Sequence, residues 1–151
     1  MTEESAENGR AIYDVFFERG EVRPVFRKEY ISLWSGWLGK EQLHLLDEVS
    51  KEEWQRFNRV LIGAFGAFRM GVVNRTAEMV EFPTQIEPLL SEHEEAMQKD
   101  ASQFAQFVIP ELDCVISEEW DYTYILWHRG TGALEAIKPL LSEAKLQHFS
   151  D

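Results

Sequence analysis

Apolar residues recur at steps of three and four in several segments of the first 109 residues. This spacing places the apolar residues of each segment on one face of a helix. Gly20 suits the end of a first helix, and Pro24 and Gly39 suit the start and the end of a second. Ser50 and Glu53 form an S-x-x-E capping box, which is typical of a helix that begins there. The predicted helices cover residues 10–19, 24–38, 43–49, 50–72 and 84–109.

Three glycines lie within the fourth predicted helix, where each costs about 1 kcal/mol relative to alanine. They are Gly63, Gly66 and Gly71. We expect them to allow close approach of a neighbouring helix. The same stretch is not a phosphate-binding loop, because no G-K-[ST] ending and no preceding strand pattern is present.

The apolar period changes to two after Pro110, where every second residue from Leu112 to Ile116 is apolar. Residues 122–128 are rich in tyrosine, tryptophan and isoleucine, as strands are. The four residues 118–121 between the two runs predict a hairpin loop. A helix over 133–144 and a short strand over 146–149 complete the chain. The predicted fold class is therefore α+β, with a mostly helical body of four to five helices and a C-terminal β-hairpin, helix and short strand (ββαβ).

The predicted loop length sets the pairing of the two strands. It places Ser117 opposite Tyr122 and Val115 opposite Tyr124. Cys114 and His128 then fall on opposite faces of the sheet, so the only thiol of the chain lies beyond hydrogen-bond reach of that histidine. We therefore expect a packed core cysteine and no catalytic one.

The composition fits one domain. The chain has 151 residues, of which 44% are hydrophobic, enough to fill a core. We expect residues 10–151 to form a single α+β domain and residues 1–9 to be disordered. The polar, acidic start lacks the features of a secretory signal, and no apolar run is long enough to span a membrane. A lone cysteine adds to the expectation of a cytoplasmic protein.

The negative charge is concentrated in one segment. The chain has a net charge of −12, and residues 81–121 hold eleven acidic residues and one basic residue. Such a segment repels phosphate backbones, which argues against direct nucleic-acid binding. We expect it to favour encounter with a basic protein; the alternative is a solvated helix face with an acidic turn, which would have the same composition.

Catalytic and metal-binding motifs are weak in this sequence. Glu41 and His44 match the E-x-x-H element of di-iron bundles, but no second pair of this kind occurs. No G-x-S-x-G, H-E-x-x-H or G-x-G-x-x-G motif is present. We predict no cofactor, no metal site and no catalytic residue. An enzyme remains the less favoured alternative.

The stretch from Ser117 to His128 combines acidic and aromatic residues, which is typical of anchors in protein interfaces. We predict a binding protein that occludes a basic partner, as an inhibitor or an immunity or antitoxin-type factor does. Alternatively, Trp120 folds back over the core and helices cover the tyrosines. The predicted partner-binding residues are Glu118, Glu119, Trp120, Asp121, Tyr122, Tyr124, Glu94 and Glu95.

Two other functions stay open from the sequence. One is a small-molecule-binding protein or enzyme with an aromatic pocket between helices, lined by Tyr30, Trp34, Phe65 and His93. His93 lies on an apolar stripe, where a core histidine is the plainer interpretation. The other is a structural subunit of a larger assembly, which a large exposed apolar patch would indicate.

Overall fold

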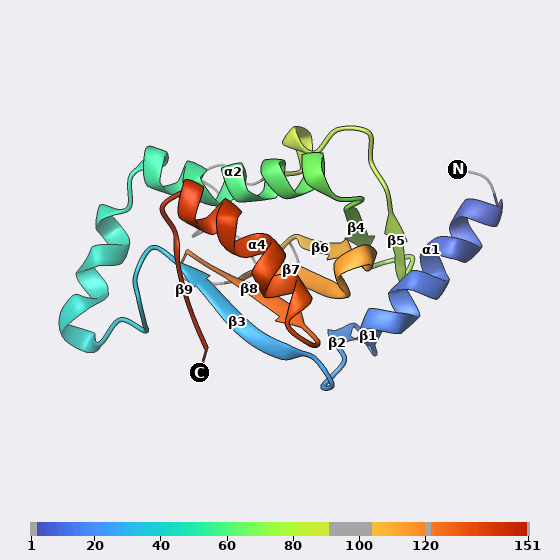
Figure 1. Cartoon of the computed structure of the whole chain (residues 1–151), viewed down its shortest axis with the longest axis horizontal. Helices are drawn as coiled ribbons and strands as arrows, with labels where there is room; N and C mark the ends of the chain where they lie inside the picture. The colour runs from blue at the N-terminus through green and yellow to red at the C-terminus, as the bar shows by residue number, and fades with distance from the viewer. Residues whose placement is uncertain (1–2, 91–103, 120–121, 151) are drawn as a thin grey trace.

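A seven-stranded antiparallel sheet forms the centre of the molecule (Figure 1). The computed structural model describes residues 3–90, 104–119 and 122–150. The strand order in the sheet is β5-β4-β6-β7-β8-β3-β9. These strands are β3 (Arg27–Ser32), β4 (Gly71–Asn74), β5 (Met79–Glu81), β6 (Gln106–Ile109), β7 (Cys114–Glu119), β8 (Thr123–His128) and β9 (Gln147–Phe149). The prediction of a mostly helical body is therefore wrong, because the sheet organises the α+β fold.

One face of the sheet, here called the first face, packs against the helices α2 (Lys51–Ala67) and α4 (Gly132–Glu143), which run along the same side in Figure 1. Residues that pair across antiparallel strands share a face. Tyr124 and Leu126 of β8 therefore join Trp54 and Phe57 of α2 and Ile137 of α4 in one apolar cluster. This cluster is the larger core.

The opposite or second face is covered at one end by α1 (Glu3–Phe16) and by a small hairpin of β1 (Phe17–Glu18) and β2 (Glu21–Val22). Tyr13, Phe16 and Phe17 pack there with Val108 and Val115 of the sheet. Helix α1 begins at Glu3, within the segment 1–9 for which we expected disorder. Within the described residues, no helix is long and apolar enough to cross a membrane.

The C-terminal order β7, β8, α4 and β9 matches the predicted ββαβ arrangement. The capping box of α2 is also confirmed, since Ser50 Oγ accepts from the Glu53 backbone N–H at 3.1 Å. Gly63 allows close approach of α4, because a Cβ atom there would lie 2.9 Å from Leu140 Cδ2. Gly71 lies in β4 and not in the helix.

The predicted second helix, residues 24–38, is instead strand β3 followed by a loop. The predicted helix over residues 43–49 overlaps the 3-10 helix η1 (Lys40–Glu48). Residues 29–32 are all buried, so β3 shows no alternation of apolar and polar positions. A strand covered on both faces lacks the period-two signal that identifies it. Gly20 does not end a helix either. Arg19 and Gly20 form the two-residue turn between β1 and β2, with φ of 55° and 82°.

The predicted helix from residue 84 to 109 is wrong at both described ends. Residues 87–89 form the short 3-10 helix η2 (Glu87–Leu89), and residues 91–103 lie outside the described part of the chain. Residues 106–109 form strand β6, which pairs with β4 and β7. Its continuous apolar run Phe107-Val108-Ile109 is buried on both faces, and such a short run fits a helix and a strand equally well.

Candidate functional site

The β7–β8 hairpin pairs Glu119 with Thr123 and Cys114 with His128, so three residues separate the strands. The predicted four-residue loop is wrong. Tyr122 closes the turn at φ 53°, in the left-handed region that three-residue hairpin loops use at this position. Tyrosine gives no sequence signal for that conformation, which glycine or asparagine would have given.

The corrected register places Cys114 and His128 on the same face, contrary to the prediction. Cys114 is nevertheless fully buried, at 0% exposure. Burial raises the pKa of its thiol from 9.0 to about 12, and the neighbouring carboxylate of Asp113 adds to the shift. The thiolate needed for nucleophilic attack is therefore scarce at neutral pH. Burial, and not the strand register, is what argues against a catalytic cysteine.

We expect the Cys114 thiol to resist iodoacetamide at pH 8 in the folded protein and to react readily in 6 M guanidinium chloride. The pKa of about 12 and full burial both disfavour the reactive thiolate. Mass spectrometry of timed samples measures the alkylated fraction. Rapid alkylation of the folded chain would contradict this placement of the thiol.

Three of the predicted partner-binding residues are buried on the first face. Tyr124 is 3% exposed, and its ring stacks on Phe57 at 5.3 Å between centroids. Tyr122 meets Trp54 edge-on at 5.5 Å. Glu118 is 1% exposed and accepts the Ala105 backbone N–H at 3.0 Å. These side chains therefore lack the exposed surface that an interface anchor requires. Trp120, Asp121, Glu94 and Glu95 lie outside the described residues.

Most of the acidic residues of segment 81–121 that the structure describes have partners within the chain. Six of them lie in the described part, and five of these six accept or share hydrogen bonds. The partners are Asn74 for Glu81, the Arg69 amide for Glu111, Arg129 for Asp113, the Ala105 amide for Glu118 and Ser117 for Glu119. Much of the described charge therefore serves the fold.

A cavity of about 280 Å³ opens on the second face, at the end of the sheet that α1 does not cover. We call it the aromatic pocket. It lies between strands β3 and β8 and the segment 33–46. Its lining residues are Tyr30, Ser32, Trp34, Gly36, Trp37, Leu38, Leu43, Leu46, Glu119, Thr123 and Ile125.

Two of the four residues predicted to line an aromatic pocket between helices line this cavity. Tyr30 and Trp34 line the aromatic pocket. Phe65 belongs to α2 and packs against the first-face core, and His93 lies outside the described residues. The predicted location between helices is wrong, because Tyr30 lies on a strand.

Aromatic contacts hold one wall of this pocket in place. Trp37 meets Tyr30 at 4.6 Å and Phe149 at 5.1 Å between ring centroids, both edge-on. Trp37 is still 56% exposed, so its ring spans from this aromatic contact to solvent. The backbone N–H of Trp34 donates to Ser32 Oγ at 3.2 Å, which fixes the chain where it leaves β3. Trp37 was not predicted as a pocket residue, because its apolar spacing placed it in the predicted helix over residues 24–38.

Glu119 is the charged group of the aromatic pocket, and a chain of hydrogen bonds orients it. The indole Nε1–H of Trp127 donates to Ser117 Oγ at 2.8 Å, and the Ser117 hydroxyl donates to Glu119 Oε2 at 2.7 Å. Burial raises the pKa of Glu119, while the Ser117 hydrogen bond and the charges of Lys28 and Arg75 oppose the rise. The nearby carboxylate of Glu118 adds to it.

We expect Glu119→Gln to be more stable than the parent chain at pH 7, by a margin that shrinks as the pH falls. The folded pKa of Glu119 lies above its ordinary value of 4.5, so the folded state holds the proton more tightly. The free energy of unfolding therefore falls as the pH rises through this window. Glutamine does not titrate and keeps an acceptor for Ser117. Urea unfolding of both chains between pH 4 and 7.5 measures the difference, and a margin that does not change with pH would contradict the shift.

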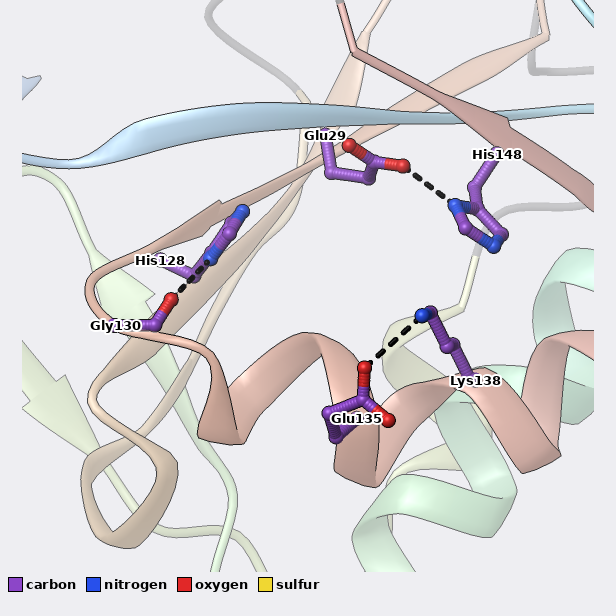
Figure 2. A network of polar contacts seen from close by, with 6 residues as sticks. All are labelled: Glu29, His128, Gly130, Glu135, Lys138 and His148. Carbon is purple, nitrogen blue, oxygen red and sulfur yellow. Dashed lines mark hydrogen bonds and ion pairs between the residues drawn. The ribbon is translucent and has the colours of Figure 1, made fainter.

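A second polar cluster lies on the first face (Figure 2). His148 of β9 points its Nδ1 at Glu29 Oε2 of β3, at 2.5 Å, beside the α4 pair Glu135 and Lys138. A histidine held by a carboxylate resembles a general base. Among the described residues, however, the only side-chain hydrogen bond found for His148 is the one to Glu29. The contact joins β9 to β3, which is a structural role.

Metal ligands do not gather in the described part of the chain. No group of three His, Cys, Asp or Glu residues in that part is placed to hold an ion. Glu41 and His44 both lie exposed on η1. The chain matches no protein-family model, no curated protein and no solved structure. The geometry and chemistry of the aromatic pocket are therefore the basis for a functional proposal.

Proposed function

We propose that this protein binds a small organic molecule in the aromatic pocket. The observation that carries the proposal is a cavity with aromatic walls and a few polar groups at one site: Ser32, Thr123 and the carboxylate of Glu119. Ligand sites combine these features, and an ionisable group with a perturbed pKa marks such sites further. Ring contacts already order Tyr30 and Trp37, so ligand binding does not have to order these side chains.

Occlusion of a basic protein partner is a second proposal with less support. Its anchors Tyr122, Tyr124 and Glu118 are buried, and most described acids of segment 81–121 have partners within the chain. It now depends on Trp120, Asp121, Glu94 and Glu95, which lie outside the described residues. Exchange of Glu94 and Glu95 for lysine would slow association with such a partner and reduce its salt dependence.

A thermal-shift panel of small amines, alcohols and carboxylic acids tests the small-molecule proposal. A compound at 100 times its Kd stabilises the folded chain by about 2.7 kcal/mol. We expect hits for the parent chain that are lost in Trp37→Ala, which removes an exposed pocket wall. Ile62→Ala is the matched control, since Ile62 is an exposed apolar residue of α2 outside the aromatic pocket. Hits that stabilise Trp37→Ala equally, or no hit at all, would refute the proposal.

A further inference from the structure

We propose that the ligand of the aromatic pocket carries an ammonium group, as a small amine or quaternary ammonium compound does, and that Glu119 is its counter-charge. This inference rests on the proposed function and narrows it to one chemical class. Three independent features of the described residues support it: the charge of the lining, the chemistry of the walls and the fixed orientation of the carboxylate.

The charge among the described lining residues of the aromatic pocket is negative. Glu119 is the only ionisable acid or base among the described lining residues, apart from the phenol of Tyr30, and none of them is lysine, arginine or histidine. An anionic ligand would face this carboxylate without a cation from any lining residue that the structure describes. A cationic ligand would gain a partly buried ion pair, which is stronger than a pair in water.

The aromatic side chains in the walls of the pocket also favour a cationic ligand. Tyr30, Trp34 and Trp37 line the cavity with electron-rich rings, a kind of ring that binds ammonium groups through its face. One face of the Tyr30 ring stacks on Phe149, with the ring centroids 5.5 Å apart. The chain's own cations already make contacts of this kind elsewhere. Lys28 Nζ lies 4.9 Å from the ring centre of Trp127, and Arg69 and Arg129 lie over Phe82 and Phe26. Lys28, which shares a face with Tyr30 on β3, is therefore engaged at Trp127, outside the pocket lining.

The carboxylate is oriented before any ligand arrives. Ser117 is 2% exposed and donates its hydroxyl to Glu119 Oε2, while Trp127 donates to Ser117. Within the described residues, no hydrogen bond to Oε1 of Glu119 is found. A group fixed in this way loses little freedom when a cation binds. As far as the described residues show, one carboxylate oxygen thus remains for an ion pair with the ligand, or for a hydrogen bond from it.

The acidity of Glu119 links ligand binding to pH. A bound cation favours the ionised carboxylate, so affinity should fall as the pH drops through the pKa of Glu119. The charged groups that act on this carboxylate are Lys28 of β3, Arg75 after β4 and Glu118 of β7. The two cations weaken the attraction for a ligand without removing it, because neither lines the cavity.

Choline and 3,3-dimethyl-1-butanol provide the test, because they have the same shape and differ in charge. We expect tryptophan fluorescence titrations at pH 7.5 to give a Kd for choline at least about 10-fold lower than for the alcohol. Glu119→Gln should raise the choline Kd by a similar factor and leave the alcohol unchanged. Glu135→Gln, on the exposed side of α4, is the control for net charge and should change neither. Circular dichroism and urea unfolding verify that each variant is folded.

The outcomes separate this inference from the proposed function. Equal binding of both probes, unchanged by Glu119→Gln, would overturn the ammonium assignment and leave the pocket as an apolar site. The ammonium assignment would also be overturned if only alcohols or carboxylic acids of the panel stabilised the chain. If no compound of the panel stabilises the chain, both the ammonium assignment and the proposed small-molecule function are refuted. A capped lysine that binds more tightly than every free amine would overturn the small-molecule source and point to a lysine side chain of a partner protein.

Discussion

Replacement of Trp54 by alanine is expected to lower the free energy of unfolding by about 3–5 kcal/mol, the largest effect of any single truncation we predict. Trp54 is 2% exposed and lies at the centre of the first-face core. Its ring contacts Phe57, Tyr122 and Tyr124, with centroid distances of 5.2, 5.5 and 6.0 Å. Loss of the indole would leave a void between α2 and the β7–β8 hairpin. Urea unfolding followed by circular dichroism measures the change.

Ile62→Ala is the matched control on the same helix. Ile62 is 41% exposed, so its truncation should cost less than about 1 kcal/mol. A loss of under 1 kcal/mol in Trp54→Ala would mean that the hairpin does not pack on α2 as described. Tyr122 would then be free to serve as a surface anchor, as the sequence had suggested.

Gly9→Ala is expected to destabilise the protein by about 1–3 kcal/mol, although alanine usually strengthens a helix. Gly9 lies in α1 where the helix meets β5. A Cβ atom there would lie 2.5 Å from the backbone carbonyl oxygen of Val80 and 3.1 Å from Met79 Cε. Because a strand backbone cannot move aside as a side chain can, the helix must shift. That shift would loosen the second-face contacts of Tyr13 and Phe16.

Gly66→Ala is the matched control, and we expect it to raise the free energy of unfolding where Gly9→Ala lowers it. Gly66 lies in α2, and a Cβ atom there meets no heavy atom within 4 Å among the described residues. Alanine should therefore stabilise the chain by up to about 1 kcal/mol through its higher helix propensity. Equal effects of Gly9→Ala and Gly66→Ala would show that α1 does not pack closely on β5.

The sequence predicted the elements whose signals are local. The capping box at Ser50 identified the start of α2, and the change of period after Pro110 identified β7 and β8. The prediction from sequence failed for strands that are buried on both faces, because such strands lack the alternation of apolar and polar residues. Strand β3 is covered on both faces over residues 29–32, and β6 is a short apolar run. Both strands therefore carried no alternation, and helical spacing was assigned to them.

The candidate site was harder to predict than the fold because it joins residues that are distant in the sequence. Tyr30 and Trp34 were expected in a pocket, but their partners Trp37 and Glu119 come from a loop and from the end of β7. Glu119 was expected on a partner-binding surface. A change in loop length from four to three residues reverses the faces that the β8 side chains occupy relative to those of β7. Tyr124 therefore lies on the core face with Ile116, and Glu118 and Glu119, which were predicted to lie in the loop, belong to β7 and point to the core and to the aromatic pocket.

The most direct test of the aromatic pocket is the ¹H–¹⁵N spectrum of the five tryptophan indoles during titration with the tightest-binding amine of the panel. Tryptophan-to-phenylalanine variants assign the five signals. The pocket predicts that the Trp34 and Trp37 signals shift and saturate together, while the signal of Trp54, on the opposite face, stays in place. Saturable binding that leaves Trp34 and Trp37 unmoved would contradict the proposed site.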